Sequence, residues 1–193
     1  MVRVGVLALQ GAFIEHFYVL KKFDFVEPIL VKRNEDLDNI EGLIIPGGES
    51  TTIGRLLERY NMRDNLKEKI LNGFPVFGTC AGLILLSKKI EQDYEQPLLG
   101  VLDVVIKRNA FGGQKESMEI DLNIKGFDSP FRAVFIRAPV IKEVGNGVEV
   151  LATLDEGAVF VKQGNILGAS FHPELTEDLR IHKFFIDIIL KRR

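Results

Sequence analysis

The segment PVFGTCAGLILLSKKI, residues 75–90, changes character in the middle. PVFGTC (75–80) has the short apolar pattern of a buried β-strand, and AGLILLSKKI (81–90) follows at once with a helical pattern. Cys80, the only cysteine of the chain, stands at the junction between two glycines. The spacing G-x-C-x-G is that of the G-x-S-x-G elbow, in which a strand turns sharply into a helix and exposes a nucleophile. The segment therefore predicts a strand–elbow–helix unit with a reactive thiol at its turn, against the alternative of an inert buried cysteine.

The residues before this unit alternate between strand and helix patterns. Apolar runs predict strands at 2–9, 26–32 and 42–48, and helical spacing predicts helices at 10–23, at 50–60 with Ser50 as N-cap, and onward to about residue 72. Strands that alternate with helices imply parallel pairing through right-handed crossovers. With the strand order 2-1-3-4, the loops that follow the first, third and fourth strands meet at one edge of the sheet, where open α/β sheets bind ligands.

The second half of the chain has a different pattern. Short strand candidates separated by turns, with little helix between them, occupy residues 107–111, 116–124, 133–139, 148–154, 158–164 and 165–172. They indicate antiparallel hairpins, and a closing helix is expected over about 176–191. We therefore expect one α/β domain over residues 1–193: a flavodoxin-like open sheet, mostly parallel, with helices on both faces and an antiparallel edge from the second half.

Composition excludes several classes of function. The formal net charge of -2 offers no general electrostatic attraction for nucleic acid or for an anionic membrane. One cysteine cannot form an internal disulfide, and the chain has no apolar run of the ~18 residues that a membrane span needs. We expect a cytoplasmic protein. The spacing of His, Cys, Asp and Glu indicates no metal site, and we expect no cofactor.

A cysteine nucleophile needs a base, and the base needs an orienting group. Of the three histidines, His172 follows a strand pattern and precedes Pro173, which prevents an immediate helix. Glu174 lies two positions later, so an extended segment would place both side chains on one face. His16 and His182 lie within predicted helices, where we interpret His16 as structural and His182 as a histidine at the edge of the core.

An acyl-transfer site also needs donors for an oxyanion. The segment IPGGEST, residues 45–51, combines a strand end, two glycines and a helix start, so its backbone amides are candidates. A simple turn that uses glycine for its backbone angles is the alternative. Gln10 and Gly11 follow the first strand and are expected at the same rim.

The motifs GTCAG, PGGEST and FHPE together resemble the triad-type (class I) glutamine amidotransferases. LALQGAF, GGEST, RNAFG and HPELTEDLRIHKFF are similar to the glutaminase subunits of two-protein pyridoxal 5′-phosphate synthases, and the resemblance covers nearly the whole chain. It implies hydrolysis of L-glutamine to L-glutamate and ammonia. It also implies a synthase subunit as the partner that accepts the ammonia and activates the glutaminase.

The resemblance also implies roles for matching residues. Cys80 would be the nucleophile, His172 the base and Glu174 its orienting partner. The amides of Gly48 and Ala81 would form the oxyanion hole. The glutamine pocket would be lined by Gly47, Gly48, Glu49, Arg108, Ile136 and Arg137. An arginine suits an amino acid's carboxylate because its planar fork can bind two oxygens.

One departure from the family is visible, because Gly113 stands where members often carry a second arginine. Two alternatives also stay open on sequence grounds. A cysteine hydrolase or peptidase could use the same triad, although arginines near Cys80 would favour a free amino acid over a peptide. A non-catalytic redox-sensing cysteine protein would have no need of His172 and Glu174.

Overall fold

The computed structural model describes residues 1–91, 95–112 and 117–192, and its elements alternate strand and helix in the first half of the chain. In chain order they are β1 (Val2–Leu7), α1 (Phe13–Leu20), β2 (Val26–Val31), the 3₁₀ helix η1 (Asn34–Asn39), β3 (Gly42–Ile45), α2 (Ser50–Arg59), α3 (Arg63–Leu71), β4 (Val76–Thr79), α4 (Ala81–Leu86), β5 (Ser87–Ile90), β6 (Leu102–Lys107), β7 (Ser117–Leu122), β8 (Phe131–Ile136), β9 (Val140–Val144), β10 (Glu149–Leu154), β11 (Gly157–Gln163), β12 (Ile166–Ala169), the 3₁₀ helix η2 (Pro173–Leu175) and α5 (Arg180–Arg192).

One large sheet organises the described part of the chain, with the strand order β2-β1-β3-β4-β12-β11-β9-β6-β5 and β10 paired to β11. Neighbours from β2 to β12 pair in parallel, which confirms the predicted order 2-1-3-4. The pairs β12–β11, β11–β9 and β9–β6 are antiparallel, as expected for the second half. The expected α/β class, with a mostly parallel centre and antiparallel strands beside it, is confirmed.

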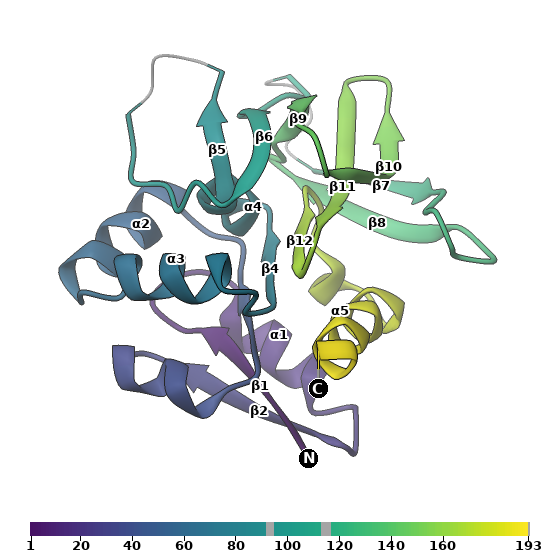
Figure 1. Cartoon of the computed structure of the whole chain (residues 1–193). Helices are drawn as coiled ribbons and strands as arrows, with labels where there is room; N and C mark the ends of the chain where they lie inside the picture. Colours follow the sequence, from purple (N-terminus) through teal and green to yellow (C-terminus); the bar gives the residue numbers. More distant parts are fainter. Residues whose placement is uncertain (92–94, 113–116, 193) are drawn as a thin grey trace.

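Helices cover both faces of this sheet (Figure 1). The strands alternate their side chains between two cores: in β3, Ile44 packs on the side of α1 and α5, and Leu43 and Ile45 pack on the side of α2, α3 and α4. Burial of both faces explains the nearly continuous apolar pattern of the first strands.

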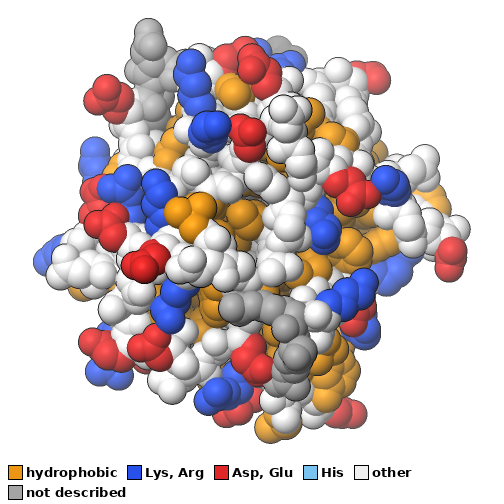
Figure 2. Space-filling view, in the orientation of Figure 1, with side chains coloured by type: hydrophobic (Ala, Val, Ile, Leu, Met, Phe, Trp, Pro, Cys, Tyr) orange, Lys and Arg blue, Asp and Glu red, His pale blue; other side chains and the backbone are white. Residues whose placement is uncertain are grey.

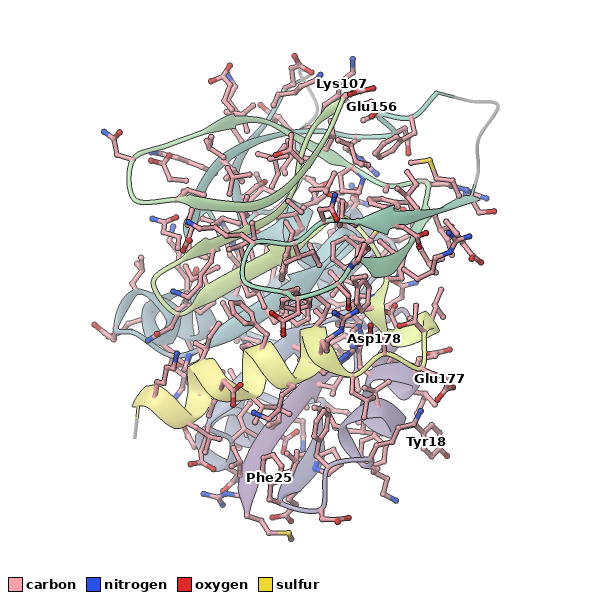
Figure 3. The ribbon with its side chains drawn as sticks, turned by 90° about the vertical axis from the view of Figure 1, so that its right-hand side faces the viewer. Tyr18, Phe25, Lys107, Glu156, Glu177 and Asp178 are labelled. Atoms are coloured by element: carbon pink, nitrogen blue, oxygen red, sulfur yellow. The ribbon has the colours of Figure 1, made fainter. Side chains whose placement is uncertain are left out.

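Helix α1 covers the sheet with one buried side and leaves the other exposed to solvent. His16 and Leu20 are fully buried on its inner side, whereas Tyr18 is 61% exposed and points away from the body of the protein (Figure 3). Lys22, just after the helix, is 2.6 Å from Glu177, so the region that follows α1 is tied to the segment before α5. Helix α1 itself contacts η2, the turn that carries Glu174.

Several predicted boundaries were wrong. The helix predicted at 81–90 ends at Leu86, because Ser87 turns extended (φ -63°, ψ 154°) and its hydroxyl donates to the Ile84 carbonyl at 2.7 Å. The following residues pair with β6 as β5. Ser50 is the first residue of α2 rather than its N-cap, and its hydroxyl donates to Gln96 Oε1 at 3.0 Å instead.

The second half also departs from prediction in detail. The strand expected at 107–111 is a turn, because β6 ends at Lys107. The strands β5, β6 and β9 were not predicted, and β5 pairs with β6 in parallel. The hairpin β7–β8 forms a separate two-stranded sheet, and it is joined to the β12 end by the hydrogen bond from His172 N–H to Val134 O at 2.8 Å.

Surface charge is mixed on the face shown in Figure 2, where blue and red side chains are interspersed. None of the helices in the described part of the chain combines the length and the apolar character needed to cross a bilayer.

Candidate active site

Cys80 lies at the sharp turn between β4 and α4. Its backbone has φ 50° and ψ -103°, a conformation that side-chain-bearing residues adopt rarely and that nucleophile elbows use. The neighbouring glycines permit close packing: a Cβ on Gly78 would lie 2.5 Å from the Gly82 carbonyl, and a Cβ on Gly82 would lie 2.1 Å from the Ile45 carbonyl oxygen. The predicted elbow is therefore present, with the turn at Cys80 and the close approach at its glycines.

His172 and Glu174 follow β12, the strand beside β4. His172 Nδ1 is 2.7 Å from Glu174 Oε1, and both side chains are buried. The pairing arises differently from our prediction, because Pro173–Leu175 forms a 3₁₀ turn rather than an extended segment. The His172 ring and Cys80 both pack on Gly47, where a Cβ would lie 2.4 Å from His172 Cε1 and 3.5 Å from Cys80 Cβ.

The protonation states of this pair follow from their surroundings. Burial acts to lower the pKa of His172, but hydrogen bonds to Cys80 and Glu174 outweigh it and raise the pKa to about 10. Burial acts to raise the pKa of Glu174, but the facing His16 and His172 rings outweigh it, so the pKa lies below its usual range. Glu174 is therefore ionised at neutral pH, and it stabilises a protonated His172.

A cavity of about 440 Å³ opens at this edge of the sheet. Its lining includes all ten residues predicted for the catalytic, oxyanion and substrate sets: Gly47, Gly48, Glu49, Cys80, Ala81, Arg108, Ile136, Arg137, His172 and Glu174. Cys80 Sγ is 3.9 Å from the Ile136 carbonyl oxygen, which brings the end of β8 to the thiol. Arg137 follows with φ 42°. The site thus combines a thiol, a base and two arginines in one cavity.

Gln10 and Gly11 lie behind the Gly47–Gly48 loop. Gln10 Oε1 accepts a hydrogen bond from Glu49 N–H at 2.8 Å. Ala12, the next residue after Gly11, donates its N–H to Gly47 O at 2.9 Å. A Cβ on Gly48 would lie 2.6 Å from Gln10 Oε1. The segment before α1 therefore holds the loop in place, as its predicted position at the rim suggested.

His16 and His182 are the residues whose surroundings sequence reasoning missed. Both are fully buried, with His16 Nε2 3.4 Å from Glu174 Oε2 and His16 Nδ1 2.9 Å from His182 Nε2. One signal was available for His16: it lies one helical turn after the cavity residue Ala12. His182 is a core residue rather than one at the core's edge.

Two further expectations concern parts of the site. Among the residues that the structure describes, no group of three or more His, Cys, Asp or Glu side chains is placed to hold a metal ion. Gly113, which departs from the family pattern, lies outside the described residues.

We expect Gly47→Ala to lower kcat/KM for glutamine by at least about 10-fold, because the new methyl group would displace the His172 ring. Gly42→Ala, in the strand β3 that precedes the Gly47 loop, is a matched control, since its Cβ would meet the Ile189 side chain in the core at 2.5 Å. It should lower thermal stability while leaving the rate per folded molecule unchanged. Equal rate losses in the two variants would contradict the contact between Gly47 and the base. Glutamate release and thermal melts measure both effects.

An open α/β sheet that presents an elbow cysteine beside a buried histidine–glutamate pair has the architecture of a cysteine-dependent amidase. The chain belongs to the SNO glutamine amidotransferase family, whose model matches residues 6–191. It is 52% identical over 194 residues to the pyridoxal 5′-phosphate synthase subunit PdxT of Clostridium botulinum, with 100% of both chains covered. It is 53% identical to the protein of the same name from Carboxydothermus hydrogenoformans, with 98% of each covered. A crystal structure of a glutamine amidotransferase superposes with a TM-score of 0.91 at 50% identity, covering 96% of this chain and 98% of the other.

Proposed function

We propose that this chain is the glutaminase of a pyridoxal 5′-phosphate synthase and that it hydrolyses L-glutamine through Cys80, His172 and Glu174. The observation that carries the proposal is the elbow cysteine packed beside a hydrogen-bonded His172–Glu174 pair, in a chain about half identical to PdxT subunits. The ammonia passes to a synthase partner that builds the vitamin B6 coenzyme. Residues 1–193 act as one glutaminase domain, and the protein works in the cytoplasm, which its single unpaired cysteine supports.

The chemistry follows from the arrangement of the three side chains. Because His172 Nδ1 donates to Glu174, Nε2 is the nitrogen available to the thiol. His172 Nε2 holds the thiol proton as Cys80 Sγ forms a bond to the side-chain amide carbon of glutamine. The carbon–nitrogen bond then breaks, and His172 gives its proton to the departing ammonia. Water, deprotonated by His172, cleaves the glutamyl thioester, and the proton returns to Cys80 sulfur.

The walls of the cavity suit a free amino acid. We assign the glutamine α-carboxylate to Arg108 and Arg137, and the oxyanion to the amides of Gly48 and Ala81. Glu49, at the same rim, is a partner for the α-amino group. Two cationic groups beside the thiol favour this substrate over an internal peptide segment, which argues against the peptidase alternative. The buried His172–Glu174 pair argues against a redox-sensing cysteine with no catalytic role.

We infer that the synthase partner switches the glutaminase on through the Gly47–Gly48 peptide. The Gly47 carbonyl is held by Ala12 N–H, and the N–H of the same peptide points in the opposite direction. A peptide between two glycines can rotate at little cost, so contacts at residues 10–12 can set its orientation. A partner that binds this segment shifts the equilibrium by its differential affinity for the active orientation.

The test compares glutamate release by the isolated chain with release in the presence of its synthase subunit. We expect about 100-fold activation, which corresponds to about 2.7 kcal/mol of coupling. Gln10→Ala, which removes the acceptor for Glu49 N–H, should change this activation ratio. A diazo-ketone analogue of glutamine should label Cys80 and should label it faster in the complex. Full turnover by the isolated chain would refute the switch and leave the triad in place, whereas no turnover in either form would refute the glutaminase itself.

A further inference from the structure

The three histidines of the chain lie in one buried cluster behind the thiol. His172 Nδ1 contacts one Glu174 oxygen at 2.7 Å, and His16 Nε2 faces the other at 3.4 Å. His16 Nδ1 is 2.9 Å from His182 Nε2. The cluster joins four elements far apart in the chain, because His16 comes from α1, Glu174 from η2 and His182 from α5, and Thr79 Oγ1 of β4 lies 3.2 Å from His16 Nε2.

Both helical histidines are neutral. Burial lowers the pKa of His182 to about 3, and it also lowers the pKa of His16, where the attraction of Glu174 opposes the effect only partly. The contact between two neutral rings needs one proton between Nδ1 of His16 and Nε2 of His182, so only one of the two nitrogens donates.

One histidine nitrogen of the cluster lacks a hydrogen-bond partner among the described residues, and it indicates which ring donates in the contact between His16 and His182. His182 Nδ1 is buried without a hydrogen-bond partner. An unpaired N–H in that position would cost more than an unpaired lone pair, so the His182 proton sits on Nε2 and is donated to His16 Nδ1. His16 must then carry its own proton on Nε2. That N–H donates to Thr79 Oγ1 at 3.2 Å and also faces Glu174 Oε2 at 3.4 Å, which is an electrostatic contact because Glu174 Oε2 has no hydrogen-bond partner among the described residues.

The opposite arrangement has two defects. With the proton on His16 Nδ1, His182 would bury its Nδ1–H with no acceptor. In addition, Glu174 Oε2 would face a lone pair of His16 at 3.4 Å, and no partner would offset the repulsion. The described contacts therefore favour a single direction of donation, from His182 to His16 and from His16 to Glu174.

We propose that His16 and His182 are positioning residues, a relay of two neutral histidines that holds Glu174 ionised and turned toward His172. This inference rests on the proposed glutaminase function. The relay contacts Glu174 Oε2, while His172 contacts Glu174 Oε1. Without the relay, the buried Glu174 Oε2, which has no hydrogen-bond partner in the described part of the chain, would also lose the His16 N–H that faces it at 3.4 Å, and the carboxylate would rotate or take up a proton. Either change would weaken its hold on the His172 ring.

The kinetic test uses the complex of this chain with its synthase subunit. His16→Leu removes the N–H that faces Glu174 Oε2, and we expect kcat to fall by about 10-fold to 100-fold with KM for glutamine little changed, since leaving a buried charged group without a polar neighbour has a cost of that size. His16→Gln can place an amide N–H where Nε2 lay and should recover most of the rate. His182→Leu should have the same kind of effect but smaller, and His182→Gln should lie near wild type.

Rates are expressed per active site titrated with the diazo-ketone, so that unfolded molecules do not count. A purely structural role predicts fewer active sites with an unchanged rate at each, and that result would overturn the relay. Equal losses in His16→Leu and His16→Gln would also overturn it. The wild-type rate and the Cys80→Ala rate, measured in parallel, test the glutaminase assignment separately.

Nitrogen-15 NMR of the wild-type chain tests the direction of donation in the relay even if a leucine variant fails to fold. We expect the His16 and His182 rings to be neutral at pH 7 with the proton on Nε2, and His172 to carry its proton on Nδ1 at least. Finding the His16 proton on Nδ1 alone would refute the direction of donation and with it the relay.

Discussion

Replacing Cys80 by alanine is expected to abolish glutamine hydrolysis, with a loss of at least about 10⁴-fold in kcat, since no other group in the cavity can form the thioester. The fold should survive. Alanine adopts the φ of 50° no less readily than cysteine, and the backbone bonds from Cys80 N–H to Ala169 O and from Ile84 N–H to Cys80 O do not involve the side chain. Removing one sulfur from the wall of an open cavity should change stability by about 1 kcal/mol or less.

The measurement is glutamate release by the purified variant in complex with its synthase subunit, beside a thermal melt. The variant should still bind glutamine, because the proposed contacts to Arg108, Arg137 and the loop amides remain. Calorimetry should therefore show binding without turnover. Turnover near the wild-type rate in a folded variant would remove Cys80 from the mechanism, and loss of both binding and folding would show that the elbow cannot accept alanine.

The elbow and the parallel half of the sheet could be predicted from sequence because their signals are local. Apolar runs ended by glycines marked β1, β3 and β4, and the G-x-C-x-G spacing marked the turn at Cys80. The predicted order of these strands then placed Gly11, Gly47 and Cys80 at one edge, whereas the position of β12, which brings His172 there, was not predicted. Resemblance was still needed for Arg108 and Arg137, since an arginine in a turn after a strand has no pattern that distinguishes it from a surface residue.

The errors came from features that depend on distant contacts. Ser87–Ile90 continues a helical pattern in sequence, but its pairing with β6 makes it a strand. The sequence indicated a structural role for His16 and placed His182 at the edge of the core, whereas both are fully buried, and it could not indicate that they face each other. That contact requires α1 and α5 to lie on the same face of the sheet, 166 residues apart in sequence.

Helix α1 contacts two parts of the site, the Gly47–Gly48 loop and the Glu174 carboxylate, and so couples them. The segment that begins this helix binds the Gly47–Gly48 loop through the hydrogen bond from Ala12 N–H to Gly47 O. One turn later the helix places His16 against Glu174. A small shift of α1 would therefore change both the contact with the Gly47–Gly48 loop and the contact between His16 and Glu174 Oε2.

His172→Asn is expected to lower kcat by at least about 10³-fold, nearly as much as the loss of the nucleophile. The asparagine amide nitrogen can occupy the place of Nδ1 and keep a donor on Glu174 Oε1, so the buried carboxylate stays satisfied. The atom that is lost is Nε2, the nitrogen that we propose takes the thiol proton. The variant therefore removes Nε2 while it keeps the hydrogen-bond donor to Glu174. A change to alanine would remove both.

The same reasoning predicts how the variants combine and what the control should show. Cys80→Ala together with His172→Asn should be no slower than Cys80→Ala alone, because the two residues act in one step. Labelling of Cys80 by the diazo-ketone should also slow in His172→Asn, because the pKa of His172, raised to about 10 by its bonds to Cys80 and Glu174, suits it to hold the thiol proton. His182→Gln, which changes a histidine of the same cluster but keeps an amide donor, should lose far less activity. If it were as inactive as His172→Asn, the base would have to be reassigned; if His172→Asn labelled and turned over at the wild-type rate, the thiol would need no base from this residue.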